Sequence, residues 1–408
     1  MRMWVYIVRR LALLVPVIIG VMTITFVLVA SIPIPQRIGA YYPANPRSQP
    51  TSPTVPCPTN PSQQCPNPAF TRAVAVLDLN QPVPVQWGLY IYDALTFHWG
   101  YVSQTSTVGR GYSGLPPLKG LPVTSAIAIF LPYTVELALL SLFFVIVFSL
   151  PLGNLSATHR NRPLDQATRV LSFSGYALPG FLFGTLLLAA VASLVAAGHT
   201  TSIICPHSTV FLDFYGSWPP PSCGIYGSHL NSFGYPTWLL GGFQSTPTGF
   251  PTIDSLLHGE YWLALDTVLR LMLPALVIAY GTVAVLLRYV RNSMLEVVNL
   301  DFVRTARAKG LPETTVITKH AGRHALNVIL TVLGLTFAGF MAGFPVIETV
   351  FDLDGVGRLF AFSLNQTGGT FDFGLIFGTV ILFTYFVVIA NVIVDVLYAY
   401  LDPRVRLG

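Results

Sequence analysis

The chain has 408 residues, of which 53% are hydrophobic and only 10% are charged. Soluble domains carry about 25% charged residues on average, so this composition excludes an ordinary soluble domain and indicates an integral membrane protein. The formal net charge of +5 comes from basic residues beside the apolar runs, and it gives no indication of nucleic-acid binding.

Six apolar runs reach or approach the roughly 20 residues that a helix needs to cross the hydrocarbon core of a membrane. They lie at about 11–32, 132–155, 171–197, 271–290, 325–350 and 373–398. We therefore predict an all-α integral membrane protein with six transmembrane helices. No small-residue cleavage site follows the first run, so we expect a retained N-terminal helix at 1–32 and not a signal peptide.

The positions of the basic residues predict the orientation of these helices. Lys and Arg flank the cytoplasmic ends of membrane helices more often than the outer ends, and here this places both termini in the cytoplasm. Two enlarged extracytoplasmic segments are then expected at 33–131 and 198–270, with a cytoplasmic loop at 291–324. The last five helices fall within a predicted core at 132–408.

All four cysteines fall in the predicted extracytoplasmic segments. Disulfides persist in oxidising compartments, so we favour the local pairs Cys57–Cys65 and Cys205–Cys223 among the three possible connectivities. A zinc site would need ligand spacing that is absent, whereas four free thiols remain an open alternative.

The first extracytoplasmic segment changes composition along its length. Residues 45–68 are rich in Pro, Ser, Thr, Asn and Gln and cannot bury enough apolar surface to form a core. We predict an irregular loop there, held by its cysteines. Residues 73–79 and 85–97 regain apolar and aromatic side chains, which predicts that this second half is folded and helical.

Three acidic residues lie within or at the ends of spanning runs: Glu136, Glu348 and Asp395. An ionised group there needs water, a partner or a cavity. We expect these residues to serve helix ends or hydrogen bonds between helices, with a proton relay or a substrate site as the alternative. Pro179 and Pro345 are expected to kink their helices.

A polar, basic segment separates the fourth and fifth runs. It consists of Asp301, Phe302, Val303, Arg304, Thr305, Ala306, Arg307, Ala308, Lys309 and Gly310. Asn299 or Asp301 can cap the first turn of a helix, and Gly310 can take the left-handed conformation that ends it. Pro312 and Glu313 suit the start of a second helix. We therefore predict a bent arm of two helices at the membrane surface.

The predicted arm has two possible uses. Its apolar side chains, Phe302, Val303 and Ala306, are expected to form one edge, which a groove in a soluble partner could bury. Its basic side chains are expected to remain in water or to pair with carboxylates of that partner. Alternatively, the arm rests on anionic lipid headgroups. Residue chemistry alone leaves both interpretations open.

Segment 301–311 resembles the cytoplasmic "EAA" loop of ABC importer permeases, in the form found in the B subunits of dipeptide and oligopeptide permeases. Other stretches resemble that family in the expected order, and the similarity covers nearly the whole chain apart from about 35–75 and 198–260. These stretches are Tyr6–Ala12, Gln81–Gln86, Leu131–Leu137, Pro151–Gly153, Glu348–Phe351, Gly355–Arg358 and Asp395–Arg404.

The resemblance implies the transmembrane domain of a type I ABC importer in the cell membrane. Its implied partners are a homologous second permease, two cytoplasmic ATPase subunits that bind ATP and magnesium, and an extracytoplasmic solute-binding protein. Residues 301–310 would form the coupling helix that an ATPase contacts, and this chain itself would be non-catalytic and bind no cofactor. The expected cargo is di- or oligopeptides or a similar small polar solute, with oligosaccharides or nickel chelates as alternatives.

Two other classes of protein are weighed against this interpretation. A stand-alone secondary transporter is expected to show an inverted repeat and charged or broken helices near the membrane midplane, and neither is visible in the sequence. A membrane-embedded enzyme would need clusters of His, Asp or Glu within a span, which the sequence lacks. The sequence also contains no Gly-Lys-Ser/Thr phosphate loop, so we do not expect this chain to hydrolyse nucleotide.

Overall fold

The computed structural model describes residues 3–41, 52–57, 62–103, 118, 120–159, 161–196, 248–259, 261–341, 343–351, 353–364 and 371–401. Within these ranges every element of regular secondary structure is a helix apart from one short two-stranded hairpin, so the all-α prediction is confirmed. The helices are α1 (Met3–Ala30), α2 (Ile34–Tyr41), α3 (Pro68–Val76), α4 (Val83–Leu95), α5 (Val123–Thr158), α6 (Pro163–Ala177), α7 (Gly180–Ala196), α9 (Pro251–Leu257), α10 (Tyr261–Val298), α11 (Asp301–Ala308), α12 (Glu313–Thr315), the π-helix η4 (Val316–Ala321), α13 (Gly322–Met341), α14 (Pro345–Val350), α15 (Val356–Leu364) and α16 (Phe373–Leu401).

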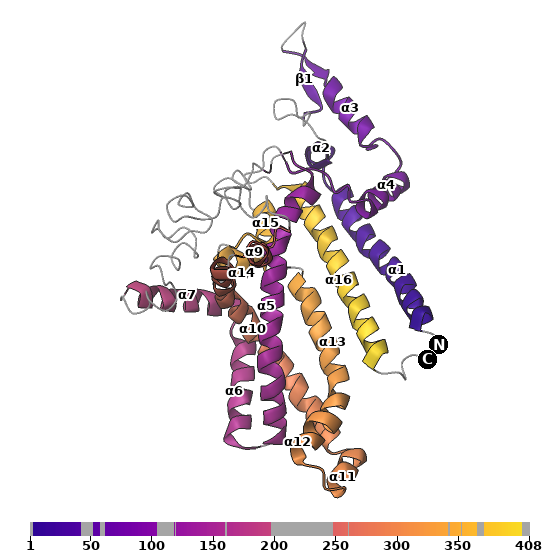
Figure 1. Ribbon diagram of the computed structural model, residues 1–408. Coiled ribbons are helices and arrows are strands. Elements are labelled where there is room, and N and C mark those ends of the chain that lie inside the picture. The colour runs from indigo at the N-terminus through magenta and orange to yellow at the C-terminus, as the bar shows by residue number, and fades with distance from the viewer. Residues whose placement is uncertain are drawn as a thin grey trace.

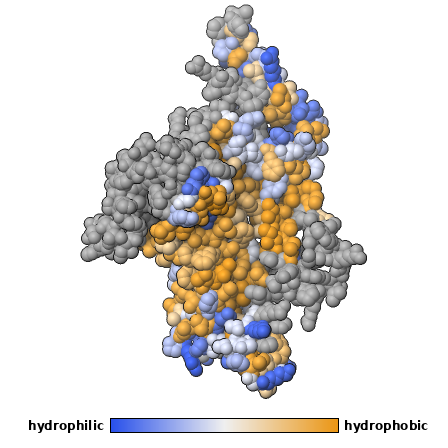
Figure 2. All heavy atoms as spheres, in the orientation of Figure 1, coloured by the Kyte–Doolittle hydropathy of each residue, from blue (hydrophilic) through white to orange (hydrophobic). Residues whose placement is uncertain are grey.

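The long helices α5, α10, α13 and α16 form the main body of the molecule (Figure 1). Helix α10 packs against α5, α6 and α13. A Cβ atom on Gly153 of α5 would lie 2.6 Å from Val290, and one on Gly175 of α6 would lie 2.6 Å from Ala284. Both contacts are too short for any larger residue, so these glycines allow α5 and α6 to approach α10 closely. Apolar residues cover the middle of the visible face (Figure 2).

Helices that could cross a membrane are fewer than the predicted six. In the described ranges, three helices are long and apolar enough: Val123–Thr158, Thr267–Val298 and Phe373–Val396. A bent pair, α6 with α7, makes a fourth if it is counted as one span. Helices α1 and α13 contribute shorter apolar stretches, Val15–Ala30 and Val332–Met341. The count of six spanning helices stays a prediction.

Two of the predicted spans are not continuous helices. The run 171–197 breaks before Pro179, and α6 and α7 meet at an angle of 102°, so that α7 projects sideways in Figure 1. The run 325–350 ends its first helix at Met341, and a separate helix begins at Pro345. Proline lacks a backbone N–H and clashes with the preceding turn, so both prolines begin new segments where we predicted kinks.

The prediction of an irregular loop at 45–68 is also wrong in part. Strands β1 (Thr54–Pro56) and β2 (Gln64–Pro66) pair in antiparallel register, with Val55 opposite Cys65. A disulfide joins Cys57 to Cys65, which holds the two strands together although neither buries a core. Cross-linking the chain replaces part of the stability that apolar burial would otherwise have to supply. The other predicted pair, Cys205–Cys223, lies outside the described residues.

The helical prediction for the second half of this segment is confirmed. Helix α3 begins at Pro68, and the side chain of Asn67 caps it by accepting hydrogen bonds from the backbone N–H groups of Ala69 and Phe70. Helix α4 covers Val83–Leu95 and begins after Pro82. The hairpin and α3 lie at the end of the molecule opposite α11 (Figure 1).

Candidate functional site

Between α10 and α13 the chain forms a bent arm that projects from one end of the bundle (Figure 1). Helix α11 covers Asp301–Ala308, Gly310 follows with φ of 75°, and α12 begins at Glu313. A residue in the left-handed conformation commonly ends a helix, and glycine adopts that conformation without steric cost. The predicted arrangement of helix, break and helix is confirmed.

The predicted side-chain cap of α11 is wrong. Leu300 occupies the N-cap position, and no side chain accepts a hydrogen bond from the first turn. The amide of Asn299 instead donates to the carbonyl oxygen of Leu295 at 2.9 Å, so it belongs to the end of α10. Asp301 is the first residue of α11, where its charge still complements the positive end of the helix dipole.

The apolar face of α11 is turned toward the rest of the arm. Val303 and Ala306 are buried in one cluster with Met294 of α10 and Val316 of η4. An eight-residue helix has only one apolar face, and here that face holds the arm together. The prediction that Val303 and Ala306 form an edge for a partner is therefore wrong. Phe302 remains exposed.

A salt bridge joins the two helices of the arm across their break. The guanidinium of Arg307 donates to both carboxylate oxygens of Glu313, with Nη2 2.7 Å from Oε1 and Nε 3.1 Å from Oε2. These hydrogen bonds raise the pKa of Arg307 and lower the pKa of Glu313. A bidentate salt bridge restricts the angle between α11 and α12 more than a single hydrogen bond would.

Replacing Glu313 by Gln is expected to loosen the arm. Because the pKa of Glu313 is lowered in the folded state from its ordinary value of 4.5, its stabilising effect is present above pH 4.5 and is lost as pH falls through its lower folded value. The pair is solvent-exposed, so the effect is about 1 kcal/mol or less. Hydrogen exchange of residues 301–321 should be faster in Glu313→Gln than in the parent chain at pH 7. The two chains should converge in acid; a difference that persists there would contradict this role.

The outer surface of the arm is mostly basic. The side chain of Arg304 is 70% exposed, and its Nη1 lies 3.4 Å from the carboxylate of Asp301, three residues earlier on the same helix. Lys309 is exposed, and the large apolar side chains exposed nearby are Leu300, Phe302 and Leu311. Hydrophilic residues gather at this end of the molecule in Figure 2. Such a surface suits an acidic partner with a few apolar contacts.

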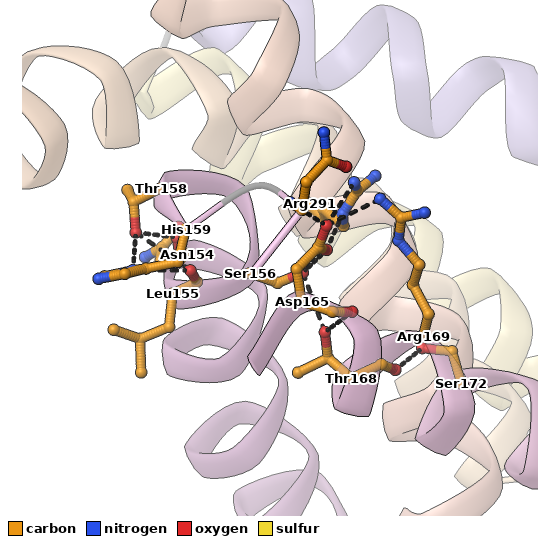
Figure 3. A network of polar contacts seen from close by, with 11 residues as sticks. Asn154, Leu155, Ser156, Thr158, His159, Asp165, Thr168, Arg169, Ser172 and Arg291 are labelled. Carbon is orange, nitrogen blue, oxygen red and sulfur yellow. Dashed lines mark hydrogen bonds and ion pairs between the residues drawn. The ribbon is translucent and has the colours of Figure 1, made fainter. Parts of the chain in front are cut away.

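A buried ionic network lies beside the base of the arm (Figure 3). The side chain of Asp165, near the start of α6, is fully buried. Its Oδ1 accepts from Ser156 Oγ at 2.6 Å and from Arg291 Nε at 2.8 Å. Its Oδ2 accepts from Arg169 Nη2 at 2.7 Å and from the backbone N–H of Asn161 at 3.0 Å. These donors come from α5, α6, α10 and the α5–α6 turn, so one carboxylate joins all four.

The network connects the arm to the remainder of the bundle. Arg291 lies on α10 seven residues before that helix ends at Val298, which is about 10 Å along the helix. The last part of α10 is therefore tied to the α5–α6 turn just before the chain enters α11. We did not single out Asp165 from the sequence. The available signal was an acid placed two residues after Pro163, a position that favours the first turn of a helix.

A second buried carboxylate lies at the opposite end of the bundle. Glu348 on α14 accepts hydrogen bonds from the backbone N–H of Phe344 at 3.3 Å and of Arg358 at 2.8 Å. It also accepts from the hydroxyl of Thr134 on α5 at 3.1 Å, and that hydroxyl in turn accepts from the N–H of Val356. Glu348 thus holds the start of α15 and the side of α5 together.

Glu136 makes a comparable link two residues further along α5. Its two carboxylate oxygens accept from the backbone N–H of Thr252 at 2.9 Å and from the Thr252 hydroxyl at 3.0 Å. Helix α9 is thereby attached to α5. The expectation that Glu136 and Glu348 serve hydrogen bonds between helices is confirmed, whereas for Asp395 on α16 it stays a prediction.

These features define a helical membrane protein whose bundle carries a bent basic arm at one end and hydrogen-bonded helices at the other. The chain belongs to the family described as binding-protein-dependent transport system inner membrane component, whose model matches residues 149–407. The match includes the arm and both buried carboxylates. The resemblance to dipeptide and oligopeptide permeases is confirmed.

Relatives resemble the chain over most of its length. The oligopeptide transport system permease protein AppB of Bacillus subtilis is 29% identical, covering 98% of this chain and 99% of its own. The dipeptide transport system permease protein DppB of Escherichia coli is also 29% identical, covering 98% of each chain. A probable D,D-dipeptide transport system permease protein of Escherichia coli is 31% identical over 81% of this chain and 83% of its own.

Proposed function

We propose that this chain is the permease subunit of an ATP-driven, solute-binding-protein-dependent importer of di- or oligopeptides. The names of its relatives support this cargo, since they denote dipeptide and oligopeptide transport systems. In the proposed arrangement six helices cross the membrane, both termini and the loop 291–324 are cytoplasmic, and the segments 33–131 and 198–270 are extracytoplasmic. The core at 132–408 forms half of the translocation pathway, and a homologous second permease supplies the other half.

The exposed basic arm carries this proposal. Two cytoplasmic ATPase subunits, which bind ATP and magnesium, dock on the arms of the two permeases, and the exposed side chains of residues 301–310 are the contact on this chain. A solute-binding protein delivers the peptide from the other side. This chain binds no cofactor and performs no covalent step.

The contacts of the arm suggest how motion passes into the bundle. Closure of the ATPases moves α11, and the buried contacts of Val303 and Ala306 oblige η4 and the end of α10 to follow. The Asp165 network then carries the movement to α5 and α6. Packed elements with such contacts shift as rigid units between two arrangements, which is what alternating access requires.

Replacing Arg304 by Glu tests this docking without disturbing the arm's core, because the Arg304 side chain is largely exposed. Like charges brought together at an interface cost up to several kcal/mol, so we expect at least about tenfold weaker binding of the ATPase. The measurement is co-purification of the ATPase with the tagged chain, together with peptide uptake. Arg72→Glu, a charge reversal at another exposed position, on α3 at the other end of the molecule, is the matched control.

Equal recovery of the ATPase with Arg304→Glu, Arg72→Glu and the parent chain would contradict the proposal. If Arg304→Glu weakens the contact of the arm with lipid but leaves the ATPase bound, the result would favour the interpretation that the arm rests on lipid headgroups. Ala306→Asp is a poor test, because it would bury a charge inside the arm and unfold it.

A further inference from the structure

Helix α4 is apolar on nearly all of its surface. Among its 13 residues, Val83–Leu95, the single charged side chain is that of Asp93. One face packs on the bundle: Trp87 Nε1 donates to the hydroxyl of Thr23 at 3.0 Å, and the rings of Tyr90 and Phe26 lie 5.7 Å apart. Helix α4 is thereby fixed across α1.

The opposite face of α4 is apolar and exposed. Val85, Leu89 and Tyr92 are 46%, 39% and 62% exposed, and their spacing of four and three residues places them on one side of the helix. Leu95, three residues after Tyr92, extends this stripe toward the end of the helix and is also exposed. A helix that is hydrophobic all round is normally covered on all sides, so something other than the described residues covers the stripe.

The level of α4 along α1 indicates what covers it. Helix α1 has 28 residues and is about 42 Å long, while the hydrocarbon core is about 30 Å thick. The apolar part of α1 begins after Arg10, so a hydrocarbon core that starts there spans about 20 residues and ends near Ala30. Thr23 and Phe26 lie seven and four residues before Ala30, or about 10 and 6 Å from that boundary. Helix α4 therefore crosses α1 at the level of the hydrocarbon, near its outer boundary.

A face of α1 next to the residues that hold α4 has the same apolar character. Ile24, Val27 and Leu28, which alternate with the residues that hold α4, are more than half exposed. These side chains lie in an apolar stretch, Val15–Ala30, of the kind that faces lipid. Trp and Tyr are enriched at the edge of a membrane, and α4 places Trp87, Tyr90 and Tyr92 there.

We propose that α4 lies in the lipid boundary of the leaflet farther from the coupling arm, with Val85, Leu89 and Tyr92 inserted among the acyl chains. The occupant of the stripe is lipid and not a protein partner, because Val85, Leu89 and Tyr92 carry no charge and a neighbouring exposed face of α1 is also apolar. The one charged residue of α4, Asp93, lies beside the stripe and not on it. Helix α4 thereby anchors the hairpin and α3 at a fixed height above the bilayer. This inference does not depend on the cargo or on the ATPase.

Spin labels on single cysteines test this placement. Cys205→Ser and Cys223→Ser leave the Cys57–Cys65 disulfide intact, and labels then follow at Leu89→Cys and Tyr92→Cys in the full chain in lipid nanodiscs. Relaxation by oxygen, which concentrates in lipid, is compared with relaxation by a water-soluble nickel chelate. Ile24→Cys on α1 is the lipid control, and Arg72→Cys on the exposed side of α3 is the water control.

At positions 89 and 92 we expect strong relaxation by oxygen and weak relaxation by nickel, as at position 24. The ratio of the two should exceed that at position 72 several-fold. A ratio like that of position 72 would show the stripe in water, and protection from both reagents would show a protein over it. Either result would overturn the proposal, whether or not the chain transports peptides.

Discussion

Asp165→Asn is expected to destabilise the folded chain by about 3–5 kcal/mol, the range for breaking a buried ion pair by removing one partner. Asp165 is fully buried and receives hydrogen bonds from two guanidinium groups, a hydroxyl and a backbone N–H. An asparagine in its place replaces one of the two accepting oxygens by an NH₂ group, which can only donate. It also leaves Arg291 without its charge partner. Unfolding of the purified chain, followed by denaturant or heat, measures the loss.

Two further variants separate the network from general sensitivity of this region. Arg169 is partly exposed and its pair with Asp165 is of the i,i+4 type, so Arg169→Ala should cost about 1 kcal/mol or less. The double variant Asp165→Asn with Arg291→Met should be more stable than Asp165→Asn alone, because it removes the unpaired charge. Additive losses in the double variant would show that Asp165 and Arg291 act separately.

Transport by these variants would report on the proposed mechanism. If the network joins the arm to α5 and α6, Asp165→Asn should lower peptide uptake for each ATP hydrolysed, even where the ATPase remains bound. Arg169→Ala should leave that ratio unchanged. An unaltered ratio in Asp165→Asn would assign the network a purely structural role.

Glu348→Gln is the second substitution with a large expected effect, about 1–3 kcal/mol of lost stability. Its carboxylate oxygens accept from two backbone N–H groups and one hydroxyl. A glutamine amide would turn an NH₂ group toward one of these donors and leave it buried without an acceptor. Val346→Ala, at an exposed position on the same helix, is the control and should have little effect.

Gly355→Ala examines the same site from the opposite side, since a Cβ there would collide with the Glu348 carboxyl. We expect both Glu348→Gln and Gly355→Ala to impair uptake while the ATPase still co-purifies, because the coupling arm lies at the other end of the bundle (Figure 1). Normal uptake and unfolding in both variants would show that the α14–α15 region does not depend on this carboxylate.

The features that depend only on residues close together in the chain could be predicted from the sequence. Gly310 ends α11 because only the backbone conformation of one residue is involved. The helices α3 and α4 follow from runs of apolar and aromatic residues between prolines. The pairing of Cys57 with Cys65 needs only a short turn of chain between them.

Features that depend on direction or on distant contacts could not be predicted in this way. Hydropathy treats 171–197 as one apolar run, although the chain turns by 102° near Pro179. The apolar face of α11 is visible in the sequence, but whether Val303 faces a partner or its own chain depends on where η4 lies. The sequence around Asp165 does not show that this residue is buried in a network, because one of its partners, Arg291, lies 126 residues away.

Photo-crosslinking from position 304 in native membranes tests the central claim most directly. A light-activated phenylalanine derivative in place of Arg304 points outward from the arm, since that side chain is largely exposed. We predict an adduct with a Walker-motif ATPase, identified by mass spectrometry, and no such adduct from the same derivative at Arg72. Adducts with lipid alone at position 304, while the ATPase is present in the membrane, would contradict the claim that this arm couples ATP hydrolysis to transport.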